Sequence, residues 1–327
     1  ANESNMIMMP ATQYRSLTTK MPSPRVAVVI VNYRTADQTI ASVQSLQNQS
    51  YASLSIIVVD NDSRDGSAEQ LQAALPGVDV IASTENGGYT GGNNIGIESA
   101  LADGADYVLV LNPDTIAINS EFISRMVDFA ERHPRAALIG PRVHWRQVGE
   151  IQNTILEFPW LHRRIRGVVR RCLRQPTPAR SASQARKAEV LSGVCLLFRA
   201  EALFDVGLFD ERTFAYIDEV DWAYRAQTQK WDLWYLPIDS IVHEQKESGY
   251  ERGSTVEFLL KRNTLYFLLK NRRRAQAAMY TLATVSLGLW HRWTGTTRHR
   301  SWLGRLIRAY RGLWLGRIDE VMGRPQS

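Results

Sequence analysis

The sequence has little of what disulfide-stabilised or membrane-spanning proteins contain. Its 327 residues include two cysteines, Cys172 and Cys195, too few for a disulfide framework or a cysteine-rich metal site. A reducing compartment is therefore expected. No apolar run reaches 18 residues, so the sequence predicts no spanning helix. The first 24 residues lack the basic and then apolar order of a signal peptide, and we interpret them as a disordered lead-in.

Acidic residues are scarce in two stretches. Residues 160–187 contain no Asp or Glu, and after Lys261 the only acids are Asp319 and Glu320. The net charge of +6 is thus concentrated in an insert at about residues 157–189 and in the C-terminal region. Such basic patches suit an anionic membrane or a phosphate-bearing lipid, and a solvated loop is the alternative for the insert. No nucleic-acid partner is expected, because few aromatic residues interleave with these charges.

The rest of the chain has the composition of a globular protein with a sizeable core, at 44% hydrophobic and 22% charged residues. Residues 107–111 form a continuous apolar run, as expected for a strand buried on both faces. Asn112, Pro113 and Asp114 follow at once, and Pro113 cannot continue a central strand. A carboxylate at this position can hold a divalent cation, although a simple strand-ending turn has the same composition.

Strand and helix patterns alternate in the first half of the chain. This order predicts an α/β protein with a doubly wound, mostly parallel sheet. Polar residues follow three of the strands, at Asn32, Asp60 and Asn112, and should meet at one edge of the sheet, where such folds bind nucleotide-sized ligands. The expected strands span residues 26–31, 54–59, 78–82 and 107–111, and the helices span residues 37–47, 67–75 and a segment ending near residue 102.

A glycine-rich stretch precedes the third helix pattern. Residues 87–92 contain four glycines, which would let backbone N–H groups approach an anion closely. No Gly-Lys-Ser/Thr follows, so this is not a phosphate-binding loop of the Walker A type. A flexible surface loop is the alternative interpretation.

The second half of the chain carries a cluster of acids. Residues 190–198 form a predicted strand containing Ser192 and Gly193, and the acids Asp218, Glu219 and Asp221 follow. Aromatic and apolar neighbours would raise the pKa of a carboxyl group in this cluster toward that of a useful base. An exposed acidic helix start is the alternative. Residues 233–237 and 241–243 read as two further strands, and the second ends at His243, a structural residue or a metal ligand.

Taken in order, these motifs resemble glycosyltransferase family 2, and within it the bacterial rhamnosyltransferase-like branch. The resemblance covers roughly residues 25–271 and rests on an ordered set of short motifs. It implies a GT-A fold and a metal-dependent, inverting transfer of a sugar from a nucleotide diphosphate. The motifs are VVIVNY from Val28, VVDNDS from Val58, ENGGY from Glu85, GGNNIG from Gly91, LNPD from Leu111, GLFDE from Gly207, DEVD from Asp218, His243 and Arg262-Asn263.

The resemblance also implies roles for individual residues. Asp114 would hold Mg²⁺ or Mn²⁺ together with His243, although Asn112 replaces the first acid of the family's Asp-x-Asp motif. The base would be Glu219, with Asp218 as the rival, because the usual Glu-Asp order is inverted here. The expected donor-binding residues are Asn32, Tyr33, Asp60, Asn61, Asn86, Gly88, Gly91, Asn93, Asn112, Ser192 and Gly193.

We divide the chain into the lead-in, a GT-A domain at residues 25–254 and a basic helical region at residues 255–327. Trp290, Trp293, Trp302 and Trp314 alternate with arginines in the last of these, as in interfacial helices. Peripheral attachment to the cytoplasmic face of an anionic membrane is therefore expected. Helices packed on the core, or a homodimer contact, are the alternatives.

The predicted function is transfer of a sugar to a lipid-linked or polysaccharide acceptor in cell-envelope glycan synthesis. Thymidine-diphosphate-rhamnose is the expected donor, by resemblance, and a uridine-diphosphate hexose is the alternative. A sugar nucleotidyltransferase would need a basic loop after the first strand, where this chain has Asn32, Tyr33 and Arg34. A non-catalytic nucleotide-binding scaffold would not need Asp114, Glu219 and His243.

Overall fold

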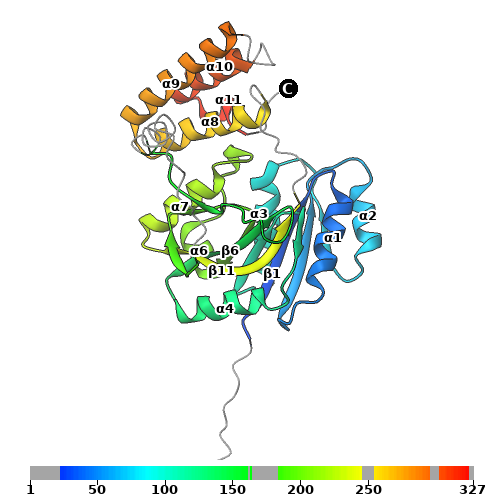
Figure 1. Cartoon of the computed structure of the whole chain (residues 1–327). Coiled ribbons are helices and arrows are strands. Elements are labelled where there is room, and N and C mark those ends of the chain that lie inside the picture. The colour runs from blue at the N-terminus through cyan, green and yellow to red at the C-terminus, as the bar shows by residue number, and fades with distance from the viewer. Residues whose placement is uncertain (1–22, 161–162, 164–182, 245–253, 295–301, 324–327) are drawn as a thin grey trace, which may run out of the picture.

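The computed structural model describes residues 23–160, 163, 183–244, 254–294 and 302–323. A mixed sheet forms its centre, with the strand order β3-β2-β1-β4-β10-β6-β11-β5 (Figure 1). The first four strands in that order are parallel to one another, as the sequence predicts. They are β1 (Val26–Asn32), β2 (Leu54–Asp60), β3 (Asp79–Ala82) and β4 (Tyr107–Leu111).

The other half of the sheet begins with a reversal of direction. Strand β10 is antiparallel to both β4 and β6, whereas β6 and β11 are parallel. Strands β5 and β8 pair antiparallel with β11. The prediction of a mostly parallel α/β sheet is thus confirmed. These strands are β5 (Thr115–Ala117), β6 (Ala136–Trp145), β8 (Arg186–Ala188), β10 (Cys195–Arg199) and β11 (Asp232–His243).

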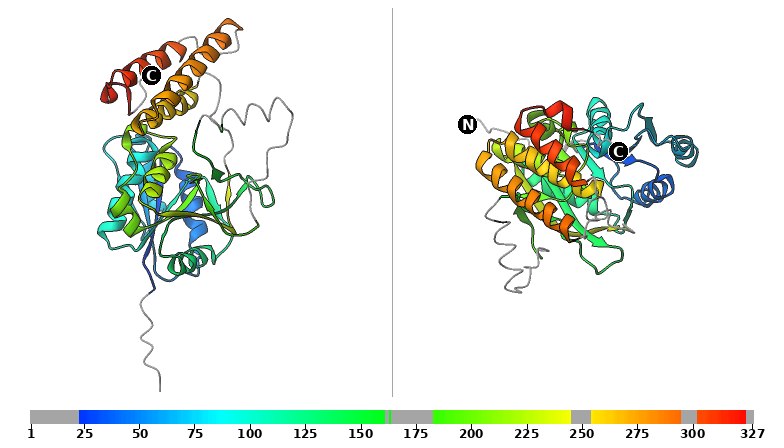
Figure 2. Two further views of the ribbon diagram at one scale, coloured as in Figure 1. Left: turned by 90° about the vertical axis from the view of Figure 1, so that its left-hand side faces the viewer. Right: turned by 90° about the horizontal axis from the view of Figure 1, so that it is seen from above.

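Helices cover both faces of the sheet (Figure 2). Alternate side chains of β1 divide between two apolar clusters, so that Val29 packs with Ile97 on one face and Val28 packs with Val43 on the other. This two-sided burial explains the unbroken apolar runs of the central strands. The helices are α1 (Ala36–Leu46), α2 (Ser67–Ala74), α3 (Gly88–Ala102), α4 (Phe122–Arg132), α6 (Ala200–Val206), the short η1 (Glu211–Thr213) and α7 (Asp218–Thr228).

Several predicted elements differ from the observed ones. The expected strand at residues 190–198 is split, because β9 (Val190–Leu191) pairs with β7 (Ile155–Leu156) in a separate ribbon before β10 begins. Residues 233–237 and 241–243 belong to the one strand β11, whose register shifts accommodate Pro237.

Four further helices lie at the end of the molecule opposite the start of β1 (Figure 1). Ser254 caps the first of them by accepting a hydrogen bond from the backbone N–H of Glu257 at 3.2 Å. No helix among the described residues is long and apolar enough to cross a bilayer. These helices are α8 (Thr255–Lys270), α9 (Arg274–Trp293), α10 (Trp302–Trp314) and α11 (Ile318–Val321).

The C-terminal helices make an aromatic contact with the rest of the chain. Phe267 of α8 stacks on Phe158, with ring centroids 6.4 Å apart, and meets the edge of Tyr224 of α7 at 5.6 Å. Trp302 is 1% exposed and lies in the same apolar core cluster as Phe158 and Phe267. The expectation that Trp302 faces a membrane is therefore wrong. The lead-in and most of the basic insert lie outside the described residues. Arg163 of the insert pairs with Glu157 and Glu189.

Candidate active site

The polar ends of the parallel strands meet as the sequence predicts. Asn32 and Asp60 are register partners at the ends of β1 and β2, and the amide of Asn32 donates to Oδ1 of Asp60 at 2.6 Å. The hydroxyl of Ser63 donates to the same oxygen at 2.6 Å, and the hydroxyl of Thr39 donates to Oδ1 of Asn32 at 2.9 Å. Both side chains are buried, so they hold two strand ends and α1 together.

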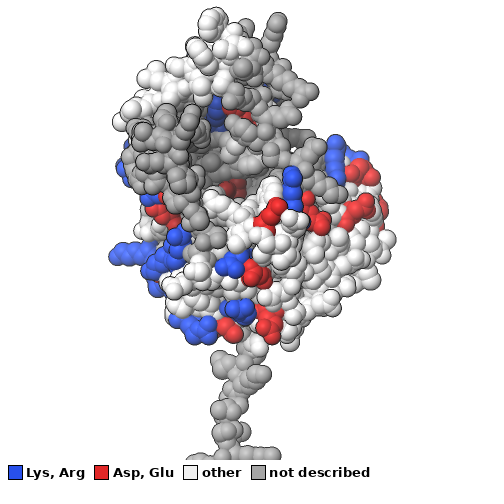
Figure 3. Space-filling view, viewed as in Figure 1, with Lys and Arg blue, Asp and Glu red and all other residues white. Residues whose placement is uncertain are grey.

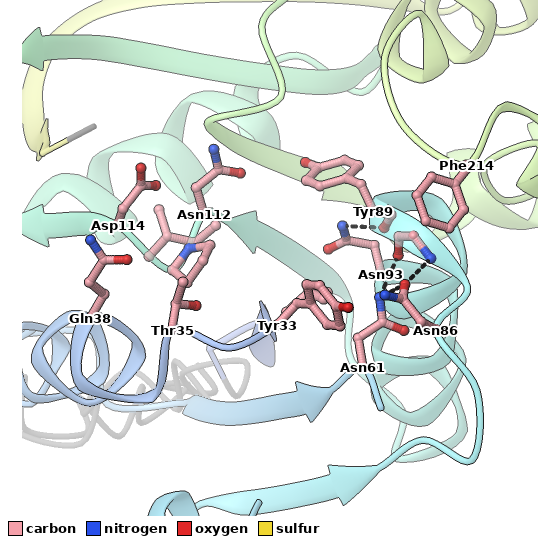
Figure 4. Close-up of a pocket in the computed structure, with 14 residues that line it drawn as sticks. Tyr33, Thr35, Gln38, Asn61, Asn86, Tyr89, Asn93, Asn112, Asp114 and Phe214 are labelled. Carbon is pink, nitrogen blue, oxygen red and sulfur yellow. Dashed lines mark hydrogen bonds between the residues drawn. The ribbon is translucent and has the colours of Figure 1, made fainter. Parts of the chain in front are cut away.

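Beside these strand ends lies a cavity of about 380 Å³, a volume typical of small-molecule sites. Asp114 and Gln38 stand at one end of it, and Asn61, Asn86 and Asn93 stand at the other (Figure 4). Its lining residues are Val31, Tyr33, Thr35, Gln38, Asn61, Asn86, Gly88, Tyr89, Asn93, Leu111, Asn112, Pro113, Asp114 and Phe214.

Two of these side chains are suited to contact a ligand. The ring of Tyr33 is 37% exposed although it lines the cavity, which gives an aromatic face on which a base can stack. Asn93 is buried, and its Nδ2 donates to the carbonyl of Tyr89 at 2.8 Å. Its Oδ1 has no hydrogen-bond partner among the described residues. A buried acceptor of this kind at a cavity wall is costly unless a ligand or water donates to it.

Most of the glycine-rich stretch lies within helix α3, whereas the sequence predicts that it precedes a helix. Helix α3 begins at Gly88, and the N–H groups of Gly87, Gly88 and Thr90 have partners within the protein. Gly87 and Gly88 donate to Oδ1 of Asn61 and Oδ1 of Asn86 at 3.1 and 2.9 Å. Thr90 donates to the carbonyl of Phe214 at 3.2 Å. These amides hold the wall of the cavity and are not free to cradle an anion.

Gly88 is the glycine that this arrangement requires. Its φ is +72°, and an added Cβ would lie 2.2 Å from the carbonyl oxygen of Phe214. We expect Gly88→Ala to lower the free energy of unfolding by about 2–4 kcal/mol, through strain and displacement of Phe214. Gly91→Ala is the matched control, because nothing lies within 4 Å of its Cβ position. The control should gain about 0.5–1 kcal/mol. Urea unfolding measures both, and equal effects would contradict this account.

Asp114 and His243 lie together at the other end of the cavity. Strand β5 pairs with β11 so that Thr115 is the register partner of His243, which brings Oδ1 of Asp114 to 3.2 Å from Nε2 of the histidine. The Nδ1 of His243 donates to Oε1 of Gln152 at 2.9 Å. In the neutral ring, Nε2 then presents a lone pair to the carboxylate, and a cation or a proton between the two atoms is needed to offset their repulsion.

These residues fit a divalent metal ion. Aspartate oxygen and imidazole nitrogen are both metal ligands, and a ligand histidine usually donates its other N–H to an oxygen, as His243 does to Gln152. Within the described ranges, no group of three or more His, Cys, Asp or Glu side chains gathers at one point. A metal ion held here would therefore need further ligands from the substrate or from water.

The acid cluster begins helix α7. Asp218 is buried, and Glu219 lines a second cavity of about 430 Å³ with apolar neighbours. Asp221 does not reach either cavity, because it pairs with Arg225 at 2.9 Å and with Lys270 of α8 at 2.8 Å. The second cavity is lined by Leu156, Glu157, Phe158, Pro159, Arg163, Tyr216, Ile217, Glu219, Val220 and Leu260.

Burial controls the protonation of the two adjacent acids. Loss of solvation raises the pKa of Glu219 to about 8, and the charge of Asp218 adds to this effect. Loss of solvation likewise raises the pKa of Asp218 to about 6. At neutral pH the two carboxyl groups together therefore tend to hold one proton. At a pH near their pKa values, the pair can accept a proton from another group. The sequence-based expectation of a raised pKa in this cluster agrees with the geometry.

Residues close together in the chain line the two cavities, because Phe214 lines the first and Tyr216 and Ile217 line the second. Tyr89 lines the first cavity, and its buried hydroxyl donates to the carbonyl of Gly193 at 2.7 Å. Burial and then the charges of Asp218 and Glu219 raise the pKa of Tyr89 well above its usual value. The acids thus lie outside the lining of the first cavity, but near enough to Tyr89 for their charges to act on it.

The predicted site residues fall into three groups. Some line the first cavity, one lines the second, and the others line neither. The first cavity includes Tyr33, Asn61, Asn86, Gly88, Asn93, Asn112 and Asp114, and the second includes Glu219. The residues that line neither are Asn32, Asp60, Gly91, Ser192, Gly193, Asp218 and His243.

Sequence reasoning did not select seven lining residues of the first cavity, namely Val31, Thr35, Gln38, Tyr89, Leu111, Pro113 and Phe214. Thr35 and Gln38 follow the first strand end closely, so their proximity to Asn32 was a usable signal. Tyr89 lies within the glycine-rich stretch, where the glycines are the more obvious signal. Phe214 has no local signal, because it reaches the cavity from a segment far along the chain.

Comparisons with known sequences agree with this geometry. Residues 27–207 match the sequence model described as "Glycosyl transferase family 2". An "N-acetylglucosaminyl-diphospho-decaprenol L-rhamnosyltransferase" of Mycobacterium tuberculosis is 29% identical over 239 residues, which are 68% of this chain and 76% of the relative. A "Low-salt glycan biosynthesis hexosyltransferase Agl10" of Haloferax volcanii is 26% identical, over 69% of this chain and 71% of the relative.

Solved structures share the fold at low sequence identity. A mannosyltransferase from Pyrobaculum calidifontis, solved in complex with GDP-Man and Mn²⁺, matches with a TM-score of 0.52 and 15% identity, over 90% of this chain and 88% of its own. GalNAc-T7, solved with UDP, GalNAc and Mn²⁺, matches with a TM-score of 0.56 and 14% identity over 76% of this chain. The alignment spans 48% of the GalNAc-T7 chain, about half its length.

Proposed function

This chain belongs to glycosyl transferase family 2, with a GT-A type of sheet, and on that premise we propose that it transfers a sugar from a nucleoside diphosphate to an acceptor hydroxyl. The observation that carries the proposal is that one short segment lines two cavities: Phe214 lines the cavity of Asp114, and Tyr216 and Ile217 line the cavity of Glu219. We propose L-rhamnose as the sugar, by likeness to the mycobacterial relative, and a uridine-diphosphate hexose as the alternative. The acceptor is a lipid-linked or polysaccharide intermediate of the cell envelope.

The first cavity takes the donor. The exposed ring of Tyr33 stacks on the base, and Oδ1 of Asn93 accepts a hydroxyl hydrogen from the ribose or the sugar. Asp114 and His243 are the residues that would hold Mg²⁺ or Mn²⁺ beside the diphosphate. When bound, such an ion supplies positive charge that stabilises the leaving diphosphate.

The second cavity takes the acceptor. The Glu219 carboxylate accepts the proton of the acceptor hydroxyl while that oxygen forms a bond to the anomeric carbon. The bond from this carbon to the diphosphate oxygen breaks on the opposite face, so the configuration inverts. Asp218 raises the proton affinity of Glu219. Apolar neighbours such as Phe158 and Leu260 suit an acceptor that has an apolar portion next to its sugar.

A donor panel tests the proposal. The full chain is mixed with thymidine-diphosphate-rhamnose, uridine-diphosphate hexoses or GDP-mannose, each with Mn²⁺, and the thermal midpoint and the release of nucleoside diphosphate are measured. We expect thymidine-diphosphate-rhamnose to raise the midpoint most and to release its diphosphate with a polyprenyl-diphosphate-linked sugar as acceptor. Binding without release would favour a scaffold. Release of pyrophosphate from a nucleoside triphosphate and a sugar phosphate would favour a nucleotidyltransferase.

We propose further that α9 attaches the protein peripherally to the cytoplasmic face of an anionic membrane. Its exposed face is almost entirely apolar, with Leu282 69% and Trp293 80% exposed. The helices at the top of the molecule are correspondingly white in the charge-coloured view (Figure 3). Exposed arginines at residues 272–274 stand at the start of this face, where they can meet anionic headgroups. The face comprises Ala275, Ala278, Met279, Leu282, Ala283, Ser286, Leu287, Leu289, Trp290 and Trp293.

Vesicle sedimentation tests the attachment. The double variant Leu282→Ser, Trp293→Ser should bind phosphatidylglycerol vesicles about tenfold or more weakly than the unchanged chain, because two large apolar side chains are lost. Phe204→Ser is the control, because Phe204 is 71% exposed on α6, away from α9. It should bind as the unchanged chain does. Equal binding by the double variant, or a concentration-dependent dimer that the double variant abolishes, would overturn this proposal.

A further inference from the structure

A short segment with an unusual backbone contributes to the lining of both cavities. Phe214, Tyr216 and Ile217 have φ values of 65°, 68° and 67°. This left-handed region is uncommon for residues other than glycine, and for a β-branched residue such as isoleucine it is an outlier that the surroundings must maintain. Phe214 lines the donor cavity, and Tyr216 and Ile217 line the cavity of Glu219. The conformation of residues 213–217 therefore determines the distance between the two walls.

One buried side chain from α8 holds this segment. The Nδ2 of Asn263 donates to the carbonyl oxygens of Thr213, Ala215 and Tyr216 at 2.9, 2.8 and 2.9 Å. Its Oδ1 accepts a hydrogen bond from Nε of Arg262 at 3.0 Å. Because the guanidinium can only donate, this contact requires that the amide oxygen face Arg262 and that the NH₂ group face the three carbonyls.

Arg262 joins the same segment to the C-terminal end of the described chain. It is buried, and it donates to the carbonyl of Thr213 at 3.1 Å. It also donates to the carbonyls of Val321 and Gly323 at 3.2 and 2.9 Å. Each of these acceptors is a backbone oxygen, and burial lowers the pKa of Arg262 to about 10. The helices beyond residue 254 thereby contact the segment that lines both cavities.

The opposite side of the segment is fixed by α3. The carbonyl of Phe214 accepts hydrogen bonds from the N–H of Thr90 at 3.2 Å and from its hydroxyl at 3.3 Å. The backbone of Gly88 lies against the same residue. Residues 213–217 are thus held between two helices, and Asn263 provides three of the contacts on the α8 side.

We infer that Asn263, oriented by Arg262, is a positioning residue for sugar transfer: it holds residues 213–217 in the conformation that keeps Phe214 at the donor and Glu219 at the acceptor. The inference rests on the proposed function for the reaction that it measures. Asn263 contacts neither cavity and acts through the backbone that it holds. Its loss should therefore impair the chemical step more than it impairs donor binding, because Tyr33, Asn93 and Asp114 remain in place.

Variants of the full chain test this role. We expect Asn263→Ala to lower kcat for transfer at least about 50-fold while the donor KM changes less than about fivefold. Asn263→Asp keeps the shape but places carboxylate oxygens against three carbonyls, and it should lower kcat at least as far. Thr264→Ala is the control, because Thr264 is buried in α8 and its hydroxyl donates to the carbonyl of Leu260 in the same helix. It should keep kcat within about threefold.

Limited proteolysis gives a readout that does not depend on activity. Chymotrypsin cleaves after Phe and Tyr, so release of the segment should accelerate cleavage after Phe214 and Tyr216 in both Asn263 variants, located by mass spectrometry, but not in the Thr264 control. Variants with wild-type cleavage and with kcat within threefold of wild type would overturn the inference. Cleavage spread over the whole chain would overturn it as well, because that result indicates general unfolding. If the unchanged chain transfers no sugar, the proposed function fails, whereas the proteolysis result still tests the positioning role.

Discussion

Replacing Glu219 by glutamine is expected to lower the rate constant of sugar transfer by about 10²–10⁴-fold while donor binding is retained, as expected for loss of a general base. The side chain keeps its size but can no longer accept the acceptor's proton. Glu219 lines the second cavity and not the donor cavity, so donor affinity should change little. Single-turnover transfer and calorimetric titration of the donor measure the two quantities separately.

The pH dependence of the unchanged enzyme has a defined sign. Transfer needs an unprotonated carboxylate that can accept the proton of the sugar acceptor's hydroxyl. The rate of transfer should therefore rise with pH through the apparent pKa values of the Asp218–Glu219 pair. Burial raises these to about 6 and about 8, above the usual range of carboxyl groups. We therefore expect low activity at pH 5 and a rise toward pH 8. A rate that is already maximal at pH 5 would remove Glu219 and Asp218 as the base.

Stability should respond in the opposite direction. A carboxyl group whose pKa is raised in the folded state contributes stability that is fully present below its unfolded pKa and is lost as pH rises through the folded pKa of about 8. Glutamine does not ionise, so Glu219→Gln should be more stable than the unchanged chain at pH 9 by about 1–3 kcal/mol in urea unfolding. The same comparison at pH 4 should show little difference.

Asp218→Asn is the matched variant, because Asp218 is the rival base. It lines neither cavity, so its loss should lower transfer less than the loss of Glu219 does. Removing its charge should also lower the pKa of Glu219 and shift the pH profile toward acid. If Asp218→Asn alone loses transfer and Glu219→Gln keeps it, the base is Asp218.

The convergence of Asn32, Asp60 and Asn112 could be predicted because buried parallel strands leave a plain signature. Each strand is a continuous apolar run that stops at a polar residue, and parallel strands end at the same edge of a sheet. What the pattern does not reveal is the depth of each side chain. Asn32 and Asp60 bond to each other and to Ser63 beneath the surface, whereas Asn112 reaches the cavity.

The glycine-rich stretch is expected from the sequence to precede a helix, whereas most of it lies within α3, because packing overrides local propensity. Glycine disfavours helices, yet α3 contains Gly91, Gly92 and Gly96. Two of these let the helix approach β1 closely. An added Cβ would lie 2.7 Å from Val31 at Gly92 and 2.3 Å from Val29 at Gly96. The glycines serve the contact between helix and sheet, which a single sequence cannot distinguish from a flexible turn.

The segment that lines both cavities could not be predicted from spacing at all. Asn263 lies about 50 positions after the carbonyl of Thr213 that it binds. Left-handed φ values at Tyr216 and Ile217 contradict the local preference of these residues. Contacts of this kind depend on the relative placement of distant helices, whereas hydrophobic periodicity describes one helix at a time.

Replacing Asp114 by asparagine is expected to abolish the response of transfer to Mg²⁺ or Mn²⁺ and to lower the rate at least about 10³-fold. Oδ1 of Asp114 lies 3.2 Å from Nε2 of His243, and Gln152 orients the ring by accepting from Nδ1. Asparagine keeps the shape of the side chain but removes its negative charge. Asp114 is the one carboxylate that this pair offers to a divalent cation. Removal of metal with a chelator should have the same effect on the unchanged chain. Mn²⁺ binding by electron paramagnetic resonance gives a second measurement that does not require turnover.

The chain offers a matched control for this charge change. Nε2 of His144 lies 2.9 Å from Oδ1 of Asp239, a histidine–aspartate pair on the neighbouring strands β6 and β11 that does not line the donor cavity. Asp239→Asn should keep the metal response and the transfer rate, because only a pair facing the diphosphate can serve the reaction. Metal-stimulated transfer that survives in Asp114→Asn would contradict the assignment. So would an equal loss in Asp239→Asn, since it would mean that any such pair is needed for folding and that neither is specific to the metal.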